Sequence, residues 1–351
     1  MQIFLFSFFL LVSIAFSAPA TNSTSTNNLL PASKAVPAKS DEIDLPAPVG
    51  EEMKGITIPQ YDADGKLKMK LSCETARKTD EHNVAIHGLK VEFFEKEGKD
   101  VTVTTDDAVF NLAKTLLSTE TMATIQREDF LMLGDSATFD TTKRFGTMKG
   151  HVHTEVRNGA PTKATQAEEM NVTTPPTPTS SSPWNFNFGH QRRPQDARTV
   201  IDAQDGAWFD DVSNTVEFFG KVVVRDPQFK LTCDRLNIVM NKNRQGLQLV
   251  TATGNVNIEE QGTDDSGEKV KSTGKAEVAV YEPATGDITL KALPQSLPEQ
   301  WPQVRQGKNF QVATEVSTVM VLNSKGTFHT KGQTRTMILD TGEKEKQTPE
   351  K

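Results

Sequence analysis

Apolar and polar residues alternate along most of this chain with a period of two. In TVEFFGKVVVR, the residues Val216, Phe218, Gly220, Val222 and Val224 share one face. Such alternation is typical of β-strands that are buried on one face and solvated on the other. We find no convincing stretch with a 3.6-residue period, so the pattern predicts an all-β protein.

Other segments show the same alternation, and one of them changes phase. Apolar residues occupy odd positions up to Cys233 and even positions from Leu236 onward, with Asp234 between them. A slip of one residue turns the other face inward unless the strand bulges or bends there. Bending strands favour a sheet folded over on itself rather than a flat sandwich. The further rows are Leu67, Met69 and Leu71; Val250, Ala252, Gly254, Val256 and Ile258; and Ala276, Val278 and Val280.

Part of this pattern occurs twice in the chain: residues 131–154 align without a gap on residues 201–224. A stacked β-unit needs small and aromatic residues facing inward, an acid that starts a turn, and a glycine where the strand bends. Self-similarity of this kind predicts a stack of equivalent β-units. The shared pairs are Asp135 and Asp205, Ala137 and Ala207, Phe139 and Phe209, Asp140 and Asp210, Gly150 and Gly220, and Val152 and Val222.

The N-terminus differs from the rest of the chain. It has no charged side chain in its first 20 residues, an apolar run from Ile3 to Phe16, and small residues at Ala18 and Ala20. This pattern predicts a cleaved secretory signal. The alternative is an uncleaved inner-membrane anchor through residues 3–20, since the run is only slightly short of a spanning helix.

Composition then divides the remainder into structured and unstructured parts. Segments rich in Asn, Ser, Thr and Pro cannot build a core and separate two alternating regions. The predicted organisation is a signal at 1–20, a flexible tether at 21–50, a first β-region at 51–157, a Pro/Ser/Thr-rich linker at 158–197, a second β-region at 198–340 and a disordered tail at 341–351.

The net charge limits which ligands the protein can bind, and the two cysteines raise the question of a disulfide. The net charge is -7, which argues against a nucleic-acid binder and leaves apolar contact as the means of holding a lipid. Two cysteines in an exported chain can pair. However, Cys73 and Cys233 occupy similar settings in two similar regions, which would normally lie far apart, so we expect both thiols to be unpaired and buried.

The chain offers little for catalysis, a metal or a cofactor. His151 and His153 share a strand face at a spacing that can bind metal, but no third ligand is evident. The segment from Asp62 to Gly65 has only the start of a calcium loop and is interpreted as a turn. G-x-S-x-G, H-E-x-x-H and P-loop motifs are absent from the sequence. We therefore expect a protein that is not an enzyme.

The order of the motifs resembles one family. From Ile201 onward, A-W-F-D, F-x-G-K-V-x-V, L-T-C-D-R-L, G-N-V-N-I and T-G-K-A-E-V-A-V-Y resemble the OstA-like domain of LptA, a bridge protein of lipopolysaccharide transport. The first region resembles LptC, its membrane-proximal partner. The matching stretches there are YDADGKLKMKLSCETA, VEFF, TDDAVFNL, SATFD and GHVHTEV.

This resemblance implies two open, V-shaped β-jellyrolls whose slots bind the acyl chains of lipopolysaccharide in the periplasm. The implied partners are an inner-membrane exporter, an outer-membrane translocon and further copies joined by strand edges. The alternative is a structural or adhesive exported β-repeat protein with a closed core and no lipid ligand, because apolar faces of β-proteins are usually plain core. The expected slot residues are Ala207, Phe209, Val216, Phe218, Val222, Val224, Leu231, Ile238, Val250, Val256, Ile258, Val278, Val280 and Ile288.

Overall fold

A computed structural model describes most of the two alternating regions, all within the unit Asp41–Lys351. The predicted signal 1–20, linker 158–197 and tail 341–351 lie outside the described residues, as do residues 21–47 of the predicted tether. The structure describes residues 48–95, 98–128, 130–157, 198–227, 229–241, 247–263, 269–322 and 328–338.

Regular structure in the described part is β, apart from one 3-10 turn, η2 (Pro298–Gln300). This confirms the prediction of an all-β protein. The first region holds β1 (Glu52–Tyr61), β2 (Leu67–Lys78), β3 (Asn83–Glu95), β4 (Gly98–Asn111), β5 (Leu116–Thr119), β6 (Ala123–Gln126), β7 (Phe130–Asp140) and β8 (Phe145–Arg157). The second holds β9 (Arg198–Ala203), β10 (Gly206–Asp210), β11 (Thr215–Arg225), β12 (Phe229–Met240), β13 (Leu247–Thr263), β14 (Lys269–Glu282), β15 (Asp287–Lys291), β16 (Gln303–Gln306), β17 (Asn309–Ala313), β18 (Val319–Leu322), β19 (Phe328–Lys331) and β20 (Thr334–Ile338).

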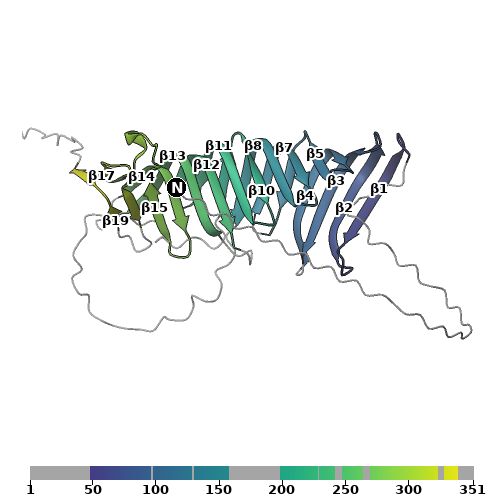
Figure 1. Ribbon diagram of the computed structural model, residues 1–351, viewed down its shortest axis with the longest axis horizontal. Coiled ribbons are helices and arrows are strands. Elements are labelled where there is room, and N and C mark those ends of the chain that lie inside the picture. The colour runs from purple at the N-terminus through teal and green to yellow at the C-terminus, as the bar shows by residue number, and fades with distance from the viewer. Residues whose placement is uncertain are drawn as a thin grey trace, which may run out of the picture. The chain divides into compact units, whose positions relative to one another are not determined.

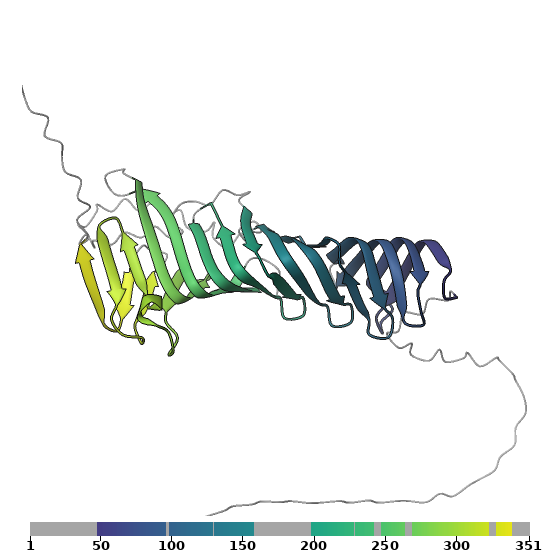
Figure 2. The same ribbon diagram turned by 90° about the horizontal axis from the view of Figure 1, so that it is seen from above.

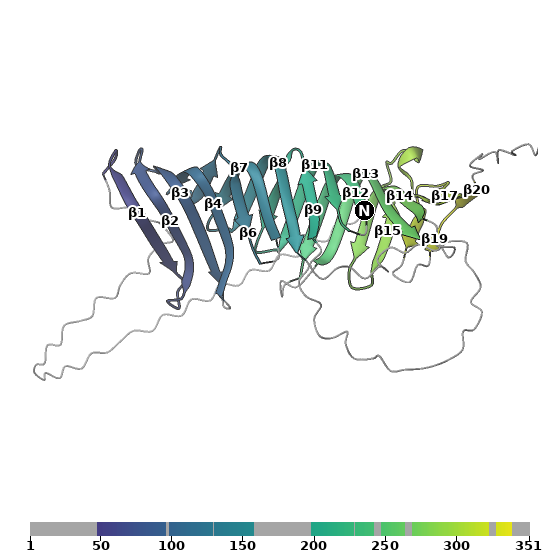
Figure 3. The same ribbon diagram turned by 180° about the vertical axis from the view of Figure 1, so that it is seen from behind.

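All these strands belong to one antiparallel sheet, and neighbours in sequence are mostly neighbours in space (Figures 1 and 3). The two regions are joined by hydrogen bonding, because β8 pairs with both β9 and β10. The division into two jellyroll domains therefore remains a prediction, drawn across a sheet that is continuous in the structure.

The sheet is folded along a line of corners into two layers. The first half of β11 pairs with β10 and its last residues pair with β9, so one strand serves both layers. We call the layer that contains β5, β10 and β15 layer A, and the layer that contains β6, β9 and β16 layer B. Seen from above, the strands curve from one layer into the other (Figure 2). The short strands come in pairs, such as β5 and β6, because one member of each pair lies in layer A and the other lies in layer B.

The corners lie where the sequence predicted bends. The register of β12 against β13 shifts between Thr232 and Arg235, at the phase change around Asp234. The register of β11 against β12 shifts between Phe219 and Val222. The strands thus keep their apolar side inward in both layers by bulging at the corner, which confirms this prediction.

An acid and a glycine meet at each of several corners. The glycines adopt positive φ, which a residue with a Cβ rarely adopts. A Cβ added to any of them would also approach the side chain of the paired acid more closely than 3.0 Å. This packing explains why the repeat preserves both residues. The pairs are Asp135 with Gly150, Asp205 with Gly220, and Asp234 with Gly254.

The second acid of the repeat starts a tight turn, as predicted. Oδ1 of Asp140 accepts hydrogen bonds from the backbone N–H groups of Thr142 and Lys143, at 3.1 and 2.9 Å. Asp210 accepts equivalent bonds from Val212 and Ser213, at 3.0 and 3.2 Å. These turns end the strands of layer A at the side opposite the corners.

The inward faces of the two layers pack against each other. Phe130 of layer B lies against Phe209 of layer A, with ring centroids 5.4 Å apart. Phe93 of layer B lies against Phe139 of layer A at 5.3 Å. Aromatic contacts of this kind add to the burial of apolar surface that holds the layers together. One buried row in layer A runs in register through Ala207, Phe218, Leu236, Ala252, Ala279, Leu290 and Met320.

Candidate functional site

The structure brings most of the predicted slot residues together on the inward face. Val250 and Ile288 are partly buried and pack against the core. The buried members are Ala207, Phe209, Val216, Phe218, Val222, Val224, Leu231, Ile238, Val256 and Ile258. They fill the space between the layers with their own side chains, so the apolar lining in this part of the sheet is packed.

Two other predicted slot residues, Val278 and Val280, lie in β14, and Val278 is buried, with 4% of its surface exposed. Val278 pairs with Thr253, and Val280 pairs with Thr251, whereas the inward Ala252 pairs with Ala279. The alternation of β14 changes phase at its corner, where two residues of β13, Gly254 and Asn255, lie opposite one residue of β14. Ala279 is thus the residue of β14 in register with the buried row of layer A, and the assignment of Val278 and Val280 to the slot stays a prediction.

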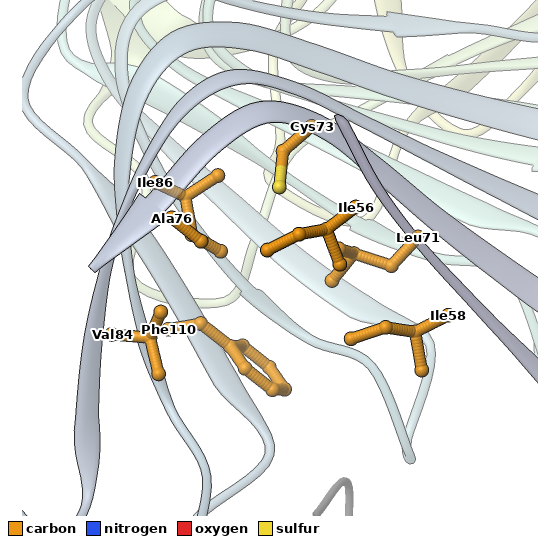
Figure 4. A pocket seen from close by; sticks show the side chains of 8 residues that line it. All are labelled: Ile56, Ile58, Leu71, Cys73, Ala76, Val84, Ile86 and Phe110. Carbon is orange, nitrogen blue, oxygen red and sulfur yellow. The ribbon is translucent and has the colours of Figure 1, made fainter. Parts of the chain in front are cut away.

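An apolar hollow lies at the opposite end of the sheet, between the layers of β1 to β4 (Figure 4). The free space inside it is small, about 10 Å³, which is room for roughly one water molecule. Ala76, Val84, Ile86 and Phe110 face the residues of β1 and the first half of β2 across this space. Eight apolar side chains line it: Ile56, Ile58, Leu71, Cys73, Ala76, Val84, Ile86 and Phe110.

Sequence reasoning did not place the hollow. The alternation of Ile56 with Ile58 and of Val84 with Ile86 signals inward faces, as it does elsewhere. The hollow lies at an end of the sheet because β1, among the described strands, pairs only with β2, so the two layers end there. The sequence pattern therefore indicates which residues line the hollow, but it does not indicate that β1 has a single neighbour among the described strands.

The side opposite the corners, which we call the mouth, is bridged by charged groups. Arg127 follows β6 at the rim of layer B, and its side chain is 2% exposed. Its Nη1 lies 3.8 Å from Oδ1 of Asp211 and 3.4 Å from the side-chain oxygen of Asn214, both in the turn after β10 in layer A. Its Nη2 lies 2.7 Å from Sδ of Met240. One arginine thus ties the two rims together.

A second arginine reaches the same carboxylate. Arg144, in the turn between β7 and β8, forms an ion pair with Asp211, whose side chain is 2% exposed. The guanidinium of Arg144 lies over the ring of Phe93 at 5.5 Å, and that of Arg127 lies over Phe130 at 4.8 Å. We call Arg127, Arg144 and Asp211 the mouth cluster. Nothing in the sequence indicated it, because its members lie in three separate turns.

Both cysteines are free and buried, as expected. Burial raises the pKa of the Cys73 thiol. Burial, with a smaller effect of the Asp234 charge, raises the pKa of Cys233 to about 12. The thiols are therefore protonated at neutral pH, and they act as small apolar residues of the interior.

A buried carboxyl near the far end of the inward face should make stability depend on pH. Burial raises the pKa of Glu260 from 4.5 to about 7, so the folded state favours its protonated form. This contribution is fully present below pH 4.5 and is lost as the pH rises through 7. We expect Glu260→Gln to stabilise the protein more at pH 8 than at pH 4. The difference between these two changes in the free energy of unfolding should be up to about 3 kcal/mol. Urea unfolding at both pH values measures this.

The adjacent Glu259 provides the control for this prediction. It lies on the other face, with Oε2 at 3.1 Å from Nζ of Lys271. Glu259→Gln should change stability by less than about 1 kcal/mol at either pH. Parallel pH profiles for the wild type and Glu260→Gln would contradict the assignment.

The residues considered for metal binding have structural partners. Nδ1 of His153 lies 2.7 Å from Oδ1 of Asp202, across the junction of β8 and β9, and Asp202 also pairs with Arg225. Asp62 closes a turn by accepting the backbone N–H groups of Asp64 and Lys66, at 3.0 and 2.8 Å. Within the described ranges, no cluster of three potential metal ligands is found.

Together, the fold and its interior define a class: a folded antiparallel sheet whose two layers enclose apolar side chains, with a hollow at one end. Residues 201–314, about a third of the chain, match the model of the family described as LptA/(LptD N-terminal domain) LPS transport protein. The resemblance of the second region to this family is thereby confirmed, and that of the first region to LptC stays a prediction.

One similar solved structure is LptH, described as the LptA homologous periplasmic component of the conserved lipopolysaccharide transport device from Pseudomonas aeruginosa. It is 17% identical, with a TM-score of 0.32, and the match covers 42% of this chain and 96% of that one. No similar protein was found among the curated proteins. In the described part of the chain, no helix has the length and apolar character needed to cross a membrane.

Proposed function

We propose that this protein is a periplasmic, non-enzymatic lipopolysaccharide carrier that holds acyl chains between the two layers of its folded sheet. The observation that carries the proposal is the match of residues 201–314 to a lipopolysaccharide-transport family, on a sheet with an apolar interior. An apolar slot suits this task because burial of a chain is favourable by about 0.8 kcal/mol per methylene and requires no fixed polar contact.

The hollow between β1 and β4 is the proposed first resting place of an acyl chain. Its lining is apolar throughout, and because its free space is only about 10 Å³, the layers would have to part there to admit a chain. The packed slot residues of the second region, such as Phe209, Phe218 and Val256, would contact lipid only when the layers separate. We propose that the chain enters at the hollow and that the layers part to let it advance.

The outer strands of the sheet are the proposed contacts with other bridge components. In the described residues β1 pairs only with β2, β19 only with β18, and β20 only with β17. Strand edges with free backbone groups bind further strands by adding to the sheet. We propose that one end meets an inner-membrane exporter and the other an outer-membrane translocon or a second copy.

Photo-crosslinking should locate the lipid. A photoreactive amino acid at Ile58, which lines the hollow, is expected to give adducts with lipopolysaccharide in cells that make it. The same residue at Thr57, which is exposed on the other face of β1, should give none. Adducts are read as mobility shifts detected with an antibody to lipopolysaccharide. Equal labelling at both positions, or none at Ile58, would contradict the proposal.

The packed interior favours a second candidate for part of the molecule. Ala207 and Val222 are 0% exposed and Phe218 is 1% exposed, as expected of a structural or adhesive β-repeat with a closed core. Mass spectrometry of lipid co-purified with the native protein separates the two. Stoichiometric lipopolysaccharide supports the carrier, whereas a lipid-free protein supports the structural role.

A further inference from the structure

We propose that Pro59 closes the β1 end of the sheet against the addition of a further strand, so that copies of this chain do not add head to tail. This inference rests on the proposed function for the role of the outer strands, and it assigns strand addition to the end that holds β19 and β20. A contact at the β1 end is then made by side chains rather than by a shared ladder of backbone hydrogen bonds.

β1 is the last described strand of both layers at its end of the sheet. Residues 52–54 lie opposite the layer A part of β2, and residues 56–61 lie opposite its layer B part. Gly55, between them, has a φ of 61°, which turns the strand at the corner. The edge that β1 presents is therefore short in layer A, and its longer half lies in layer B.

Two contacts with the β2 side show which way the backbone of this longer half faces. The backbone N–H of Ile56 points to the thiol of Cys73 in β2. The N–H of Asp62, just beyond β1, donates to the carbonyl oxygen of Lys66 at 2.8 Å. Successive residues of a strand face opposite sides in the hydrogen-bonding plane, so the residues between these two face β2 and the free edge in turn. Pro59 is the middle one of those that face the free edge.

A proline at this position removes the central hydrogen-bond donor of the edge. Proline has no N–H, and its ring occupies the direction in which the donor would reach a neighbouring strand. Thr57 and Tyr61 keep their N–H groups on either side of it. A strand added here would therefore have a gap in the middle of its ladder, and edge prolines protect natural sheets from pairing in this way.

The edge of β20, at the other end of layer B, has no such gap. The N–H of Ala313 in β17 donates to the carbonyl oxygen of Pro302 at 2.9 Å, away from β20. Opposite residues of an antiparallel pair face each other or face away together, so Thr334, opposite Ala313, has its N–H at the free edge. Every second residue of β20 does the same, and none of them is a proline. These residues are Thr334, Thr336 and Ile338.

A second copy that continued layer B head to tail would lay its β20 beside residues 56–61. The strands of layer B pair antiparallel from β1 to β20, and these two strands run in the same direction, so the junction would be a parallel ladder. A parallel ladder is slightly less stable than an antiparallel one. Pro59 would also leave one carbonyl of the added strand without its donor, so the junction is disfavoured on both counts.

Sedimentation velocity of the full chain over a rising series of concentrations tests the inference. The wild type is expected to form no species larger than a dimer, because two copies can still pair through β20. Pro59→Thr restores the donor with a residue that favours strands, and it should form a series of longer species. The dissociation constant of the head-to-tail contact should fall roughly tenfold.

Two further variants show whether the new contact joins β1 to β20. Thr336→Pro, added to Pro59→Thr, removes the central donor of the β20 edge and should return the protein to the wild-type distribution. Thr57→Val changes an exposed side chain beside Pro59, leaves every N–H in place and should behave as the wild type. Circular dichroism checks folding, and Ile338→Pro, on the same edge, replaces Thr336→Pro if that variant does not fold.

Three results would overturn the inference. They are a long series formed by the wild type, a Pro59→Thr variant that matches the wild type, and a series that persists when β20 carries the proline. The proposed function is judged separately, from the lipid that co-purifies with the wild type. A lipid-free protein whose Pro59→Thr variant forms the series would overturn the proposed function and leave the closed edge standing.

Discussion

Replacing Asp211 with alanine is expected to lower the free energy of unfolding by about 3–5 kcal/mol. The substitution leaves Arg127, which is 2% exposed, and Arg144 near each other without the carboxylate between them. Removing one partner of a buried ion pair leaves an uncompensated buried charge, whose desolvation is no longer offset. Urea unfolding followed by circular dichroism at neutral pH gives the change.

Two control variants separate charge from shape in this prediction. Replacing the whole mouth cluster by Met, Met and Leu removes every charge and should change stability far less than Asp211→Ala, since apolar side chains of similar size fill the same space. Lys143→Ala removes an exposed partner of Asp140 and should change stability by less than about 1 kcal/mol. If Asp211→Ala matched Lys143→Ala, the mouth cluster would not hold the layers together.

Gly220→Ala is expected to destabilise the fold by about 2–4 kcal/mol. Gly220 has a φ of 81°, where a Cβ is itself unfavourable by roughly 1–2 kcal/mol. Its Cβ would also overlap the side chain of Asp205, and overpacking of this kind adds about 1–3 kcal/mol. The same urea titration measures the loss, and an unchanged midpoint would contradict the corner packing.

The chain offers a matched control for each of the two effects. Gly65 has a similar φ of 77° but has open space around it, so Gly65→Ala reports the backbone effect alone. The double variant Asp205→Ala, Gly220→Ala removes the overlapping carboxylate and should recover part of the loss. A double variant as unstable as the sum of its single changes would show that Asp205 and Gly220 do not contact each other.

Much of the fold follows from local pattern. The alternation around Phe218 and Val222 predicts strands, and the phase change at Asp234 predicts a bend; the structure has both. The repeated Asp210 and Gly220 predict a turn and a corner, which they form. These features are local because alternation, turn formation and positive φ depend on residues close together in the chain.

The candidate site was predicted less well, because it depends on residues that lie far apart in the chain. Val278 was assigned to the inward face from its alternation with Ala276, but beyond the corner of β14 it is Ala279 that pairs with the inward Ala252. The hollow lined by Ile58 and Phe110 depends on how far two layers stand apart, which no segment encodes alone. Arg127 and Asp211, 84 residues apart in the sequence, meet only because the sheet folds over.

The sequence by itself determined that this is an all-β protein of repeated units, where its strands bend, and that its two thiols are buried. Tertiary structure alone decided which stretch of the interior is filled, where it stays hollow, and which charges meet at the mouth. The physical reason is range: strand periodicity and turn chemistry act over a few residues, whereas filling and pairing depend on side chains brought together from opposite layers.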